Sequence, residues 1–378
     1  MAGSKRSARA KAAASDTLSD EERQALRRGC ERWLQGHGLR PIREVLAELG
    51  TLPEEDLEAD VYGDRGSVAV LEAEVRDLLG KPAAAFMPSG TMAQQIALRV
   101  HADRTGRRVV AFHPTCHLEL HEDRAYQRLH GLVGRPVGDV HELLTLGDLE
   151  EIREPLAALV IELPQREIGG RLPAWDDLVA QVGHARDRGA AVHLDGARLW
   201  ECQPYYGRPL SEIAALFDTV YVSFYKGLGG PAGSMLLGGD DVIAEARLWR
   251  KRHGGTLFGM WPYAAGGLAG IRLRLPRMAS YVAHAQLIAQ ALSAIDGVDV
   301  APDPPQTNMM HLHLRTNEAA VSAGIRRLAT EQQVWAFSGS GAAETPGIRA
   351  MELTVGDATL GFTPGEVANI VRELLPRA

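Results

Sequence analysis

Two ionisable side chains follow short apolar runs in the middle of the chain. The run from Gly189 to Leu194 ends at Asp195, and the run from Asp218 to Phe224 is followed closely by Lys226. Short, β-branched apolar runs are typical of buried parallel strands. Because open α/β sheets bind ligands at the carboxyl ends of their strands, we expect this carboxylate and this amine to reach the same edge of one sheet.

A carboxylate and a lysine at one sheet edge suit the chemistry of pyridoxal phosphate (PLP). A lysine forms a Schiff base with the PLP aldehyde, and an acid keeps the pyridine nitrogen protonated so that the ring withdraws electrons. A buried Asp–Lys ion pair beside a glycine-rich turn is an equally good interpretation of these two residues alone. The glycines that follow Lys226, in GLGGPAG, match neither the dinucleotide fingerprint nor the P-loop.

A candidate anion site lies upstream, where an expected strand meets a helix. The strand Ala83–Phe86 leads through PSGTM into the helical run Ala93–Val100. A helix N-terminus offers unpaired backbone N–H groups to an anion. Ser89, Gly90 and Thr91 are therefore candidates for a phosphate cradle, although an ordinary Ser/Thr helix cap would also explain them.

Three histidines follow the next expected strand. The segment HPTCHLELHE spaces His113, His117 and His121 at intervals of four, with two glutamates nearby. Histidines at positions i and i+4 share a helix face and could bind a metal. However, Leu118 stands where a zinc-protease motif has glutamate, and a histidine cluster without metal is the commoner explanation. Beside a PLP site, one of these rings could instead lie flat on the cofactor.

Composition limits the class of protein. A chain of 378 residues with 45% hydrophobic content can bury a large core and predicts one large and one smaller domain. No apolar run is long enough to span a membrane, and a net charge of −7 argues against nucleic acid as the main partner. The cysteines Cys30, Cys116 and Cys202 lack metal spacing, so we expect a reduced, cytoplasmic compartment.

The order of the expected elements predicts two folding patterns. Helices over Glu21–Leu34 and Pro41–Leu49 precede an alternation of strands and helices, and a mostly helical stretch over Leu257–Ile295 leads into shorter strands and helices. We expect a disordered tail over residues 1–20. N-terminal helices and a large PLP-binding domain should occupy residues 21–275. A connecting helix and a small α+β domain should occupy residues 276–378.

Several motifs together resemble the threonine aldolase and β-eliminating lyase family of fold-type-I PLP enzymes. The similarity runs from about Asp60 to Ala291 and rests on DVYG, LE, PSGTMA, HLDGARLW, KGLGGPAGS, RKRHGG and, further on, QTN. These motifs in one order are far more specific than any one of them. The resemblance implies an α/β, aspartate aminotransferase-like large domain with a mostly parallel sheet, a small α+β C-terminal domain, and a homodimer or homotetramer with shared active sites.

The resemblance also implies roles for individual residues. Lys226 would be the Schiff-base lysine, Asp195 would hold the pyridine nitrogen, and His117 would stack on the ring. Gly90 and Thr91 would bind the phosphate. Arg198, in DGAR, would bind the α-carboxylate of an amino-acid substrate, for which its planar guanidinium is suited. Lys251 stands where the family has a lysine near a shared active site.

The chain also departs from the family pattern. Gln165, in ELPQREIGG, stands where a histidine usually handles the substrate hydroxyl, and Tyr225 replaces the serine before the lysine. Phe258 aligns with the arginine of the usual GGGMRQ segment. A second carboxylate-binding arginine aligns with either Arg349 or Glu352, and Glu352 could not bind a carboxylate.

The implied activity is retro-aldol cleavage of a β-hydroxy-α-amino acid to glycine and an aldehyde. β-Elimination or other α-carbon chemistry is one alternative; a metal-dependent hydrolase built on the three histidines, or a non-catalytic module, is another. Because Gln165 cannot act as a base near neutral pH, we expect His117, His121 or a water to take the β-hydroxyl proton. We also expect L-threonine to be a poorer substrate than amino acids whose larger side chains pack against Phe258 and Tyr225.

Overall fold

The computed structural model describes residues 17–376, which form two compact units. The larger unit comprises residues 41–278, and the smaller one combines the segment before residue 41 with the segment after residue 278. The sequence predicts a disordered tail over residues 1–20. Residues 1–16 of that segment lie outside the described residues. The rest of that segment is structured, because Leu18 is buried and its N–H donates to Ser322 Oγ at 3.2 Å.

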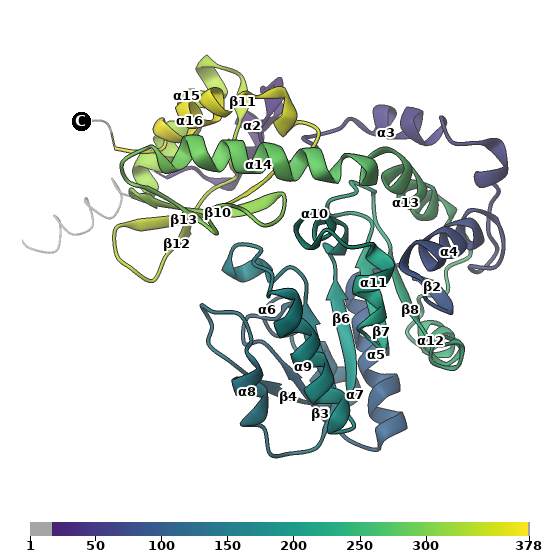
Figure 1. The fold of residues 1–378 in the computed structure, drawn as a ribbon. Helices are drawn as coiled ribbons and strands as arrows, with labels where there is room; N and C mark the ends of the chain where they lie inside the picture. Colours follow the sequence, from purple (N-terminus) through teal and green to yellow (C-terminus); the bar gives the residue numbers. More distant parts are fainter. Residues whose placement is uncertain (1–16, 377–378) are drawn as a thin grey trace, which may run out of the picture. The chain divides into compact units, whose positions relative to one another are not determined.

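The larger unit is built on a seven-stranded sheet (Figure 1). Its strands lie in the order β2 (Ala83–Met87), β8 (Ser234–Gly238), β7 (Thr219–Ser223), β6 (Ala191–Gly196), β5 (Leu156–Glu162), β3 (Val109–Phe112) and β4 (Val133–Pro136). Strand β8 runs antiparallel to both of its neighbours, and the other pairs are parallel. The predicted α/β fold with a mostly parallel sheet is confirmed.

Helices pack on this sheet because its strands are apolar on both faces. All residues of β7 and β8 are buried, as expected for strands covered on two sides. Helix α5 (Gly90–Thr105) packs along β5–β8, and α12 (Asp240–Arg252) packs on α5 and β2. Helix α4 (Gly66–Leu79) packs on β2, α11 (Leu210–Ala215) and α13 (Trp261–Leu273), while α9 (Trp175–Asp187) packs on β6 and α8 (Leu146–Glu150).

Shorter helices complete the larger unit. They are α3 (Ile42–Leu49), η1 (Glu54–Asp56), α6 (His117–Leu120), α7 (Ala125–His130), η2 (Arg166–Ile168), η3 (Leu199–Glu201), α10 (Gln203–Tyr206) and η4 (Leu275–Arg277). Three of these, α6, η2 and η3, follow the carboxyl ends of β3, β5 and β6 in the chain. The loops at that edge of the sheet therefore carry most of the candidate residues.

The smaller unit contains a four-stranded antiparallel sheet in the order β12 (Gly341–Ala342), β13 (Ile348–Thr354), β10 (Met309–Arg315) and β9 (Val298–Ala301). Its helices are α2 (Asp20–Arg28), α14 (Met278–Ser293), α15 (Glu318–Glu331), α16 (Pro364–Arg372) and the short η5 (Thr359–Gly361). Within residues 17–376, no helix of either unit has the length and apolar character needed to cross a membrane.

The N-terminal segment differs from the expected division, which kept residues 21–40 with the large domain. Strand β1 (Arg32–Trp33) pairs in parallel with β11 (Val334–Trp335), and Gly36 N–H donates to Thr354 O at 2.8 Å. These bonds belong to the smaller unit. The helix expected over Glu21–Leu34 accordingly ends at Arg28, since the chain turns there into β1.

Candidate active site

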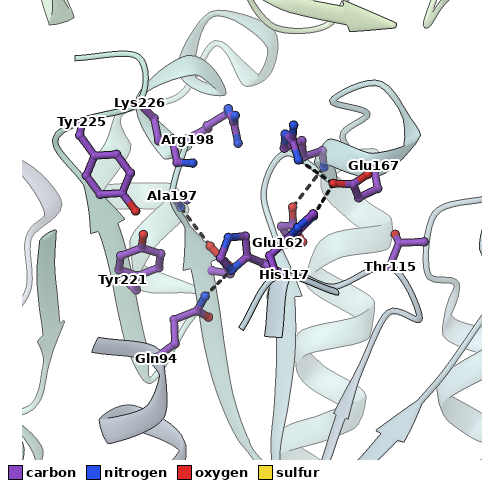
Figure 2. Close-up of a pocket in the computed structure, with 13 residues that line it drawn as sticks. Gln94, Thr115, His117, Glu162, Glu167, Ala197, Arg198, Tyr221, Tyr225 and Lys226 are labelled. Carbon is purple, nitrogen blue, oxygen red and sulfur yellow. Dashed lines mark hydrogen bonds and ion pairs between the residues drawn. The ribbon is translucent and has the colours of Figure 1, made fainter. Parts of the chain in front are cut away.

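A pocket of about 370 Å³, partly open to solvent, lies at the edge of the sheet and is lined by His117, Asp195, Arg198 and Lys226 among the predicted residues (Figure 2). Asp195 reaches it from β6, and Lys226 reaches it from the turn after β7. The pocket also brings in residues from α5, α6, η2 and the loops between them. Its lining consists of Gln94, Thr115, His117, His121, Glu162, Arg166, Glu167, Asp195, Ala197, Arg198, Tyr221, Tyr225 and Lys226.

Asp195 is held at the base of this pocket by two donors. Gln94 Nε2 donates to one carboxylate oxygen at 2.8 Å, and the Ala197 N–H donates to the other at 3.2 Å. The residue is 1% exposed, and burial raises the pKa of its carboxyl although the charge of His117 acts in the opposite direction. A cation placed against this carboxylate would offset the cost of burying its charge.

His117 points into the same pocket, as Figure 2 shows. Its Nδ1 lies 3.0 Å from Glu122 Oε1, and Gln95 Nε2 donates to the other Glu122 oxygen at 2.7 Å. The hydrogen bond to Glu122 raises the pKa of His117, and burial opposes that shift. Because Glu122 is itself fixed by a glutamine, the imidazole has a defined orientation.

The N-terminus of α5 borders the pocket through Gly90. A Cβ added at Gly90 would lie 2.0 Å from Tyr221 Oη, so only glycine allows helix and pocket wall to approach so closely. The Ser89 hydroxyl accepts from the Met92 N–H at 3.3 Å. Ser89 is therefore the N-cap of α5, which is the alternative explanation that the sequence offered for this residue. The first N–H groups of this 16-residue helix, at Gly90 and Thr91, have no partner within the helix.

These features fit PLP. A helix N-terminus suits a phosphate, a buried carboxylate suits a protonated ring nitrogen, and the Lys226 amine suits an aldehyde. Arg198 lines the same pocket and is suited to a carboxylate. The Nζ of Lys226 lies 5.2 Å from the centre of the Tyr225 ring, the residue that replaces a serine of the family pattern.

Gln165 lies behind the pocket wall. It is 4% exposed, donates to Thr115 Oγ1 at 3.1 Å and to Glu162 Oε2 at 3.4 Å, and borders a second cavity of about 300 Å³. Gln165 therefore contacts two residues that line the first pocket, Thr115 and Glu162.

Lys251 and Phe258 are not among the residues that line this pocket. Lys251 is exposed near the end of α12, and Phe258 is 71% exposed and packs edge-on against Tyr62. Arg349 belongs to the smaller unit, where it donates to Glu318 and Ser340. Its guanidinium is already engaged by a carboxylate of its own chain. Because side chains alternate along a strand, Arg349 and Glu352 point to opposite faces of β13.

The three histidines do not converge on one point. His113 Nε2 lies 2.8 Å from the carbonyl oxygens of Asp139 and Glu142, whereas His121 Nε2 lies 2.9 Å from a Glu167 oxygen. His117 is engaged by Glu122. In the part of the chain that the structure describes, no three His, Cys, Asp or Glu residues are grouped so that they could hold a metal.

The sequence interpretation missed several residues of the pocket, above all Gln94 and Glu162. Gln94 lies one helical turn after Gly90, so the spacing of four could have indicated it. Glu162 ends the apolar strand β5, which is the same signal that identified Asp195. Burial raises the pKa of Glu162 to about 8, and the charge of Asp195 adds to this effect.

Comparison with known proteins agrees with this geometry. Residues 40–315 match the model of the β-eliminating lyase family. The low specificity L-threonine aldolase of Escherichia coli (strain K12) is 30% identical over 74% of this chain and 84% of its own. A candidate L-allo-threonine aldolase from Listeria monocytogenes EGD-E has a solved structure that is 37% identical, covers 93% of this chain and 98% of its own, and has a TM-score of 0.87.

A second solved structure is similarly close. It is a candidate aromatic amino acid β-eliminating lyase/threonine aldolase from Exiguobacterium sp. 255-15, with 37% identity, coverage of 92% of this chain and 98% of its own, and a TM-score of 0.86. Sheet, pocket and similarity together define a fold-type-I PLP enzyme. The chain belongs to the threonine aldolase and β-eliminating lyase family. It is therefore a PLP-dependent lyase, and the predicted family, fold class, cofactor and enzyme class are confirmed.

Proposed function

We propose that the protein cleaves β-hydroxy-α-amino acids between the α- and β-carbons, which yields glycine and an aldehyde. The observation that carries this proposal is that Lys226, Asp195 and Arg198 line one pocket, so an amine, a buried acid and a carboxylate-binding cation are available together. The similar proteins named as threonine aldolases support the same substrate class.

Each proposed role follows from a side chain's position. PLP, when bound, supplies the electron-withdrawing ring that accepts the electrons of the broken bond. Lys226 carries the amine that binds its aldehyde and can move a proton at the α-carbon, and Asp195 holds the proton of the ring nitrogen. Arg198 binds the α-carboxylate. His117, oriented by Glu122, packs against the ring.

The phosphate would lie at the N-terminus of α5. The N–H groups of Gly90 and Thr91 face no partner within the helix, and the Ser89 cap fixes the first turn around them. Arg349 is left out of this proposal, because Glu318 occupies its guanidinium.

We also propose that the protein forms a homodimer or homotetramer with active sites shared between subunits. We further propose that it works in a reducing, cytoplasmic compartment. Support for assembly comes from exposed large apolar side chains in the larger unit, among which Tyr62 and Phe258 pack with ring centres 5.5 Å apart. Lys251 would act at the site of a second copy. Light scattering at several concentrations tests the assembly, and a Tyr62→Ser/Phe258→Ser variant that keeps the parent's mass would contradict this interface.

A product assay tests the proposed reaction directly. The holoenzyme is incubated with a panel of β-hydroxy-α-amino acids, and glycine, aldehyde, keto acid and ammonia are measured. Glycine and aldehyde in equal amounts are the expected result. Ammonia with a keto acid would instead indicate β-elimination and would contradict the cleavage proposed here. A visible absorption band that borohydride removes checks the Lys226 linkage in the same preparation.

A further inference from the structure

Glu162 lies beside Asp195 at the edge of the sheet. The two residues are register partners on the parallel strands β5 and β6, so their side chains point to the same face. Both line the pocket, and Figure 2 shows Glu162 between His117 and Glu167. A second carboxylate therefore stands next to the one that the cofactor would use.

Two neighbours fix the Glu162 carboxylate. The Arg166 N–H donates to Oε1 at 3.2 Å, and Gln165 Nε2 donates to Oε2 at 3.4 Å. A carboxylate has about four lone-pair sites, so two donors leave it able to accept a further hydrogen bond. Gln165, which replaces the usual histidine, is thus a partner of Glu162 and borders a different cavity.

Charged and titratable groups surround Glu162 from every neighbouring element. They are Cys116, His117 and His121 around α6, Arg166 and Glu167 on η2, Asp195 and Arg198 around the end of β6, and Lys226 after β7. Burial and the charge of Asp195 raise the pKa of Glu162 to about 8, while His117 and Arg198 act in the opposite direction. A general base is most effective when its pKa lies near the working pH.

The two histidines in the pocket are less suited to the same task. The bond to Glu122 raises the pKa of His117 and so favours the protonated ring, which cannot accept a proton. His121 Nε2 is engaged by Glu167 at 2.9 Å.

We propose that Glu162 takes the proton of the substrate β-hydroxyl, an inference that rests on the proposed aldol cleavage. The O–H bond breaks and its proton passes to the Glu162 carboxylate. The C–O bond becomes the C=O of the aldehyde as the Cα–Cβ bond breaks. The electron pair of that bond stays with the α-carbon side, and later protonation of that carbon gives glycine. Gln165 holds the carboxylate in place through its amide, which makes it a positioning residue.

The test separates this step from the rest of the chemistry. Exchange of the glycine α-protons with D₂O needs the cofactor and Lys226 but no β-hydroxyl base. For Glu162→Gln, cleavage of a β-hydroxy-α-amino acid should therefore fall by about a hundredfold or more, the range expected for a lost general base. Glycine exchange, PLP content and the glycine-induced change of the visible band should stay within a few-fold. Glu142→Gln, an exposed glutamate outside the pocket, is the matched control.

The pH profile gives a second readout. A carboxyl group with a raised pKa becomes a carboxylate as pH increases, so kcat of the parent should rise through pH about 8. Glu162→Gln should lose this rise, and Glu162→Asp should recover part of the rate with a shifted profile. A purely structural role for Glu162 would not produce this pattern.

Three outcomes would overturn the inference. If Glu162→Gln cleaves within a few-fold of the parent, Glu162 is not the base, and the proposed function still stands. If cleavage and glycine exchange fall equally and the visible band shifts, Glu162 acts on the cofactor instead of the hydroxyl. If the parent exchanges glycine protons but releases no aldehyde from any β-hydroxy-α-amino acid, the proposed function itself fails, and this inference fails with it.

Discussion

The two walls of the pocket differ in how closely they follow the family pattern. One wall, at the ends of β6 and β7, carries Asp195, Arg198 and Lys226 within motifs typical of the family. The other, at the end of β5 and in η2, carries Glu162 and Arg166 in the segment where Gln165 replaces a histidine. We refer to them as the β6–β7 wall and the β5 wall.

This difference reflects how strictly chemistry limits each wall. A Schiff base requires a lysine, and a protonated pyridine nitrogen requires an acid next to it, so the residue types of the β6–β7 wall have few substitutes. A hydroxyl proton can be taken by any group of suitable pKa within hydrogen-bonding distance. The β5 wall can therefore change its residues while the reaction class stays the same.

The largest effect is expected for Lys226→Ala on the β6–β7 wall. No other lysine lines this pocket among the described residues, so the variant should lose cleavage, glycine exchange and the visible band together. Lys226→Arg, which keeps the positive charge without a suitable amine, should lose the same three signals. Activity and the band are measured on both proteins. A Lys226→Ala protein that keeps them would show that another amine binds the cofactor.

Asp195→Asn should cause the next largest loss, at least about a hundredfold, which is the scale of one preorganised electrostatic contact at a reacting centre. A neutral amide cannot hold the proton of the ring nitrogen, although it can still accept from Gln94 or the Ala197 N–H. Because the β6–β7 wall serves every step, glycine exchange and cleavage should fall in parallel. If Asp195→Asn lost cleavage but kept glycine exchange, its effect would match the one expected for Glu162→Gln, and the two walls would not differ in their roles.

The same contrast explains how much of the structure could be predicted from the sequence. The strand expected over Ala83–Phe86 and the helix expected over Pro41–Leu49 lie within one residue of the observed β2 (Ala83–Met87) and α3 (Ile42–Leu49), because apolar runs and helical spacing are local signals. Asp195 and Lys226 were found through the same logic, since each closely follows such a run. Glu162 carried an equal signal but no familiar motif, so its place in the pocket was missed.

Other features depend on residues far away in the chain. Strand β1 forms only because β11, about 300 residues later, pairs with it, so local spacing predicted a longer helix there. Phe258 and Arg349 were expected at the substrate by alignment. The Phe258 ring packs against Tyr62, and the Arg349 guanidinium donates to Glu318, contacts that no pattern near them indicates.

On the β5 wall, Gln165→His should raise kcat/KM by a few-fold for small β-hydroxy amino acids such as L-threonine. The imidazole would meet the same neighbours, Thr115 and Glu162, and would add a group that titrates near neutral pH. Gln165→Asn, which shortens the amide, should lower the rate because it withdraws a donor from Glu162. Initial rates with L-threonine and with a larger analogue measure both. The absence of any gain in Gln165→His would mean that the hydroxyl lies beyond this residue's reach.

Glu122→Gln should have the smallest effect on rate and a clear effect on ionisation. The hydrogen bond that the His117 ring donates to Glu122 raises the pKa of His117, so replacing that carboxylate with an amide should lower the pKa and release the ring proton at lower pH. An NMR titration of the His117 ring, assigned with His117→Phe, measures the shift, and Glu119→Gln on α6 is the control. Because Glu122 supports the cofactor side of the pocket, the rise of kcat through pH about 8, which we assign to Glu162, should remain. If that rise moves together with the His117 titration, the proton acceptor is His117, and the β5 wall does not supply the base.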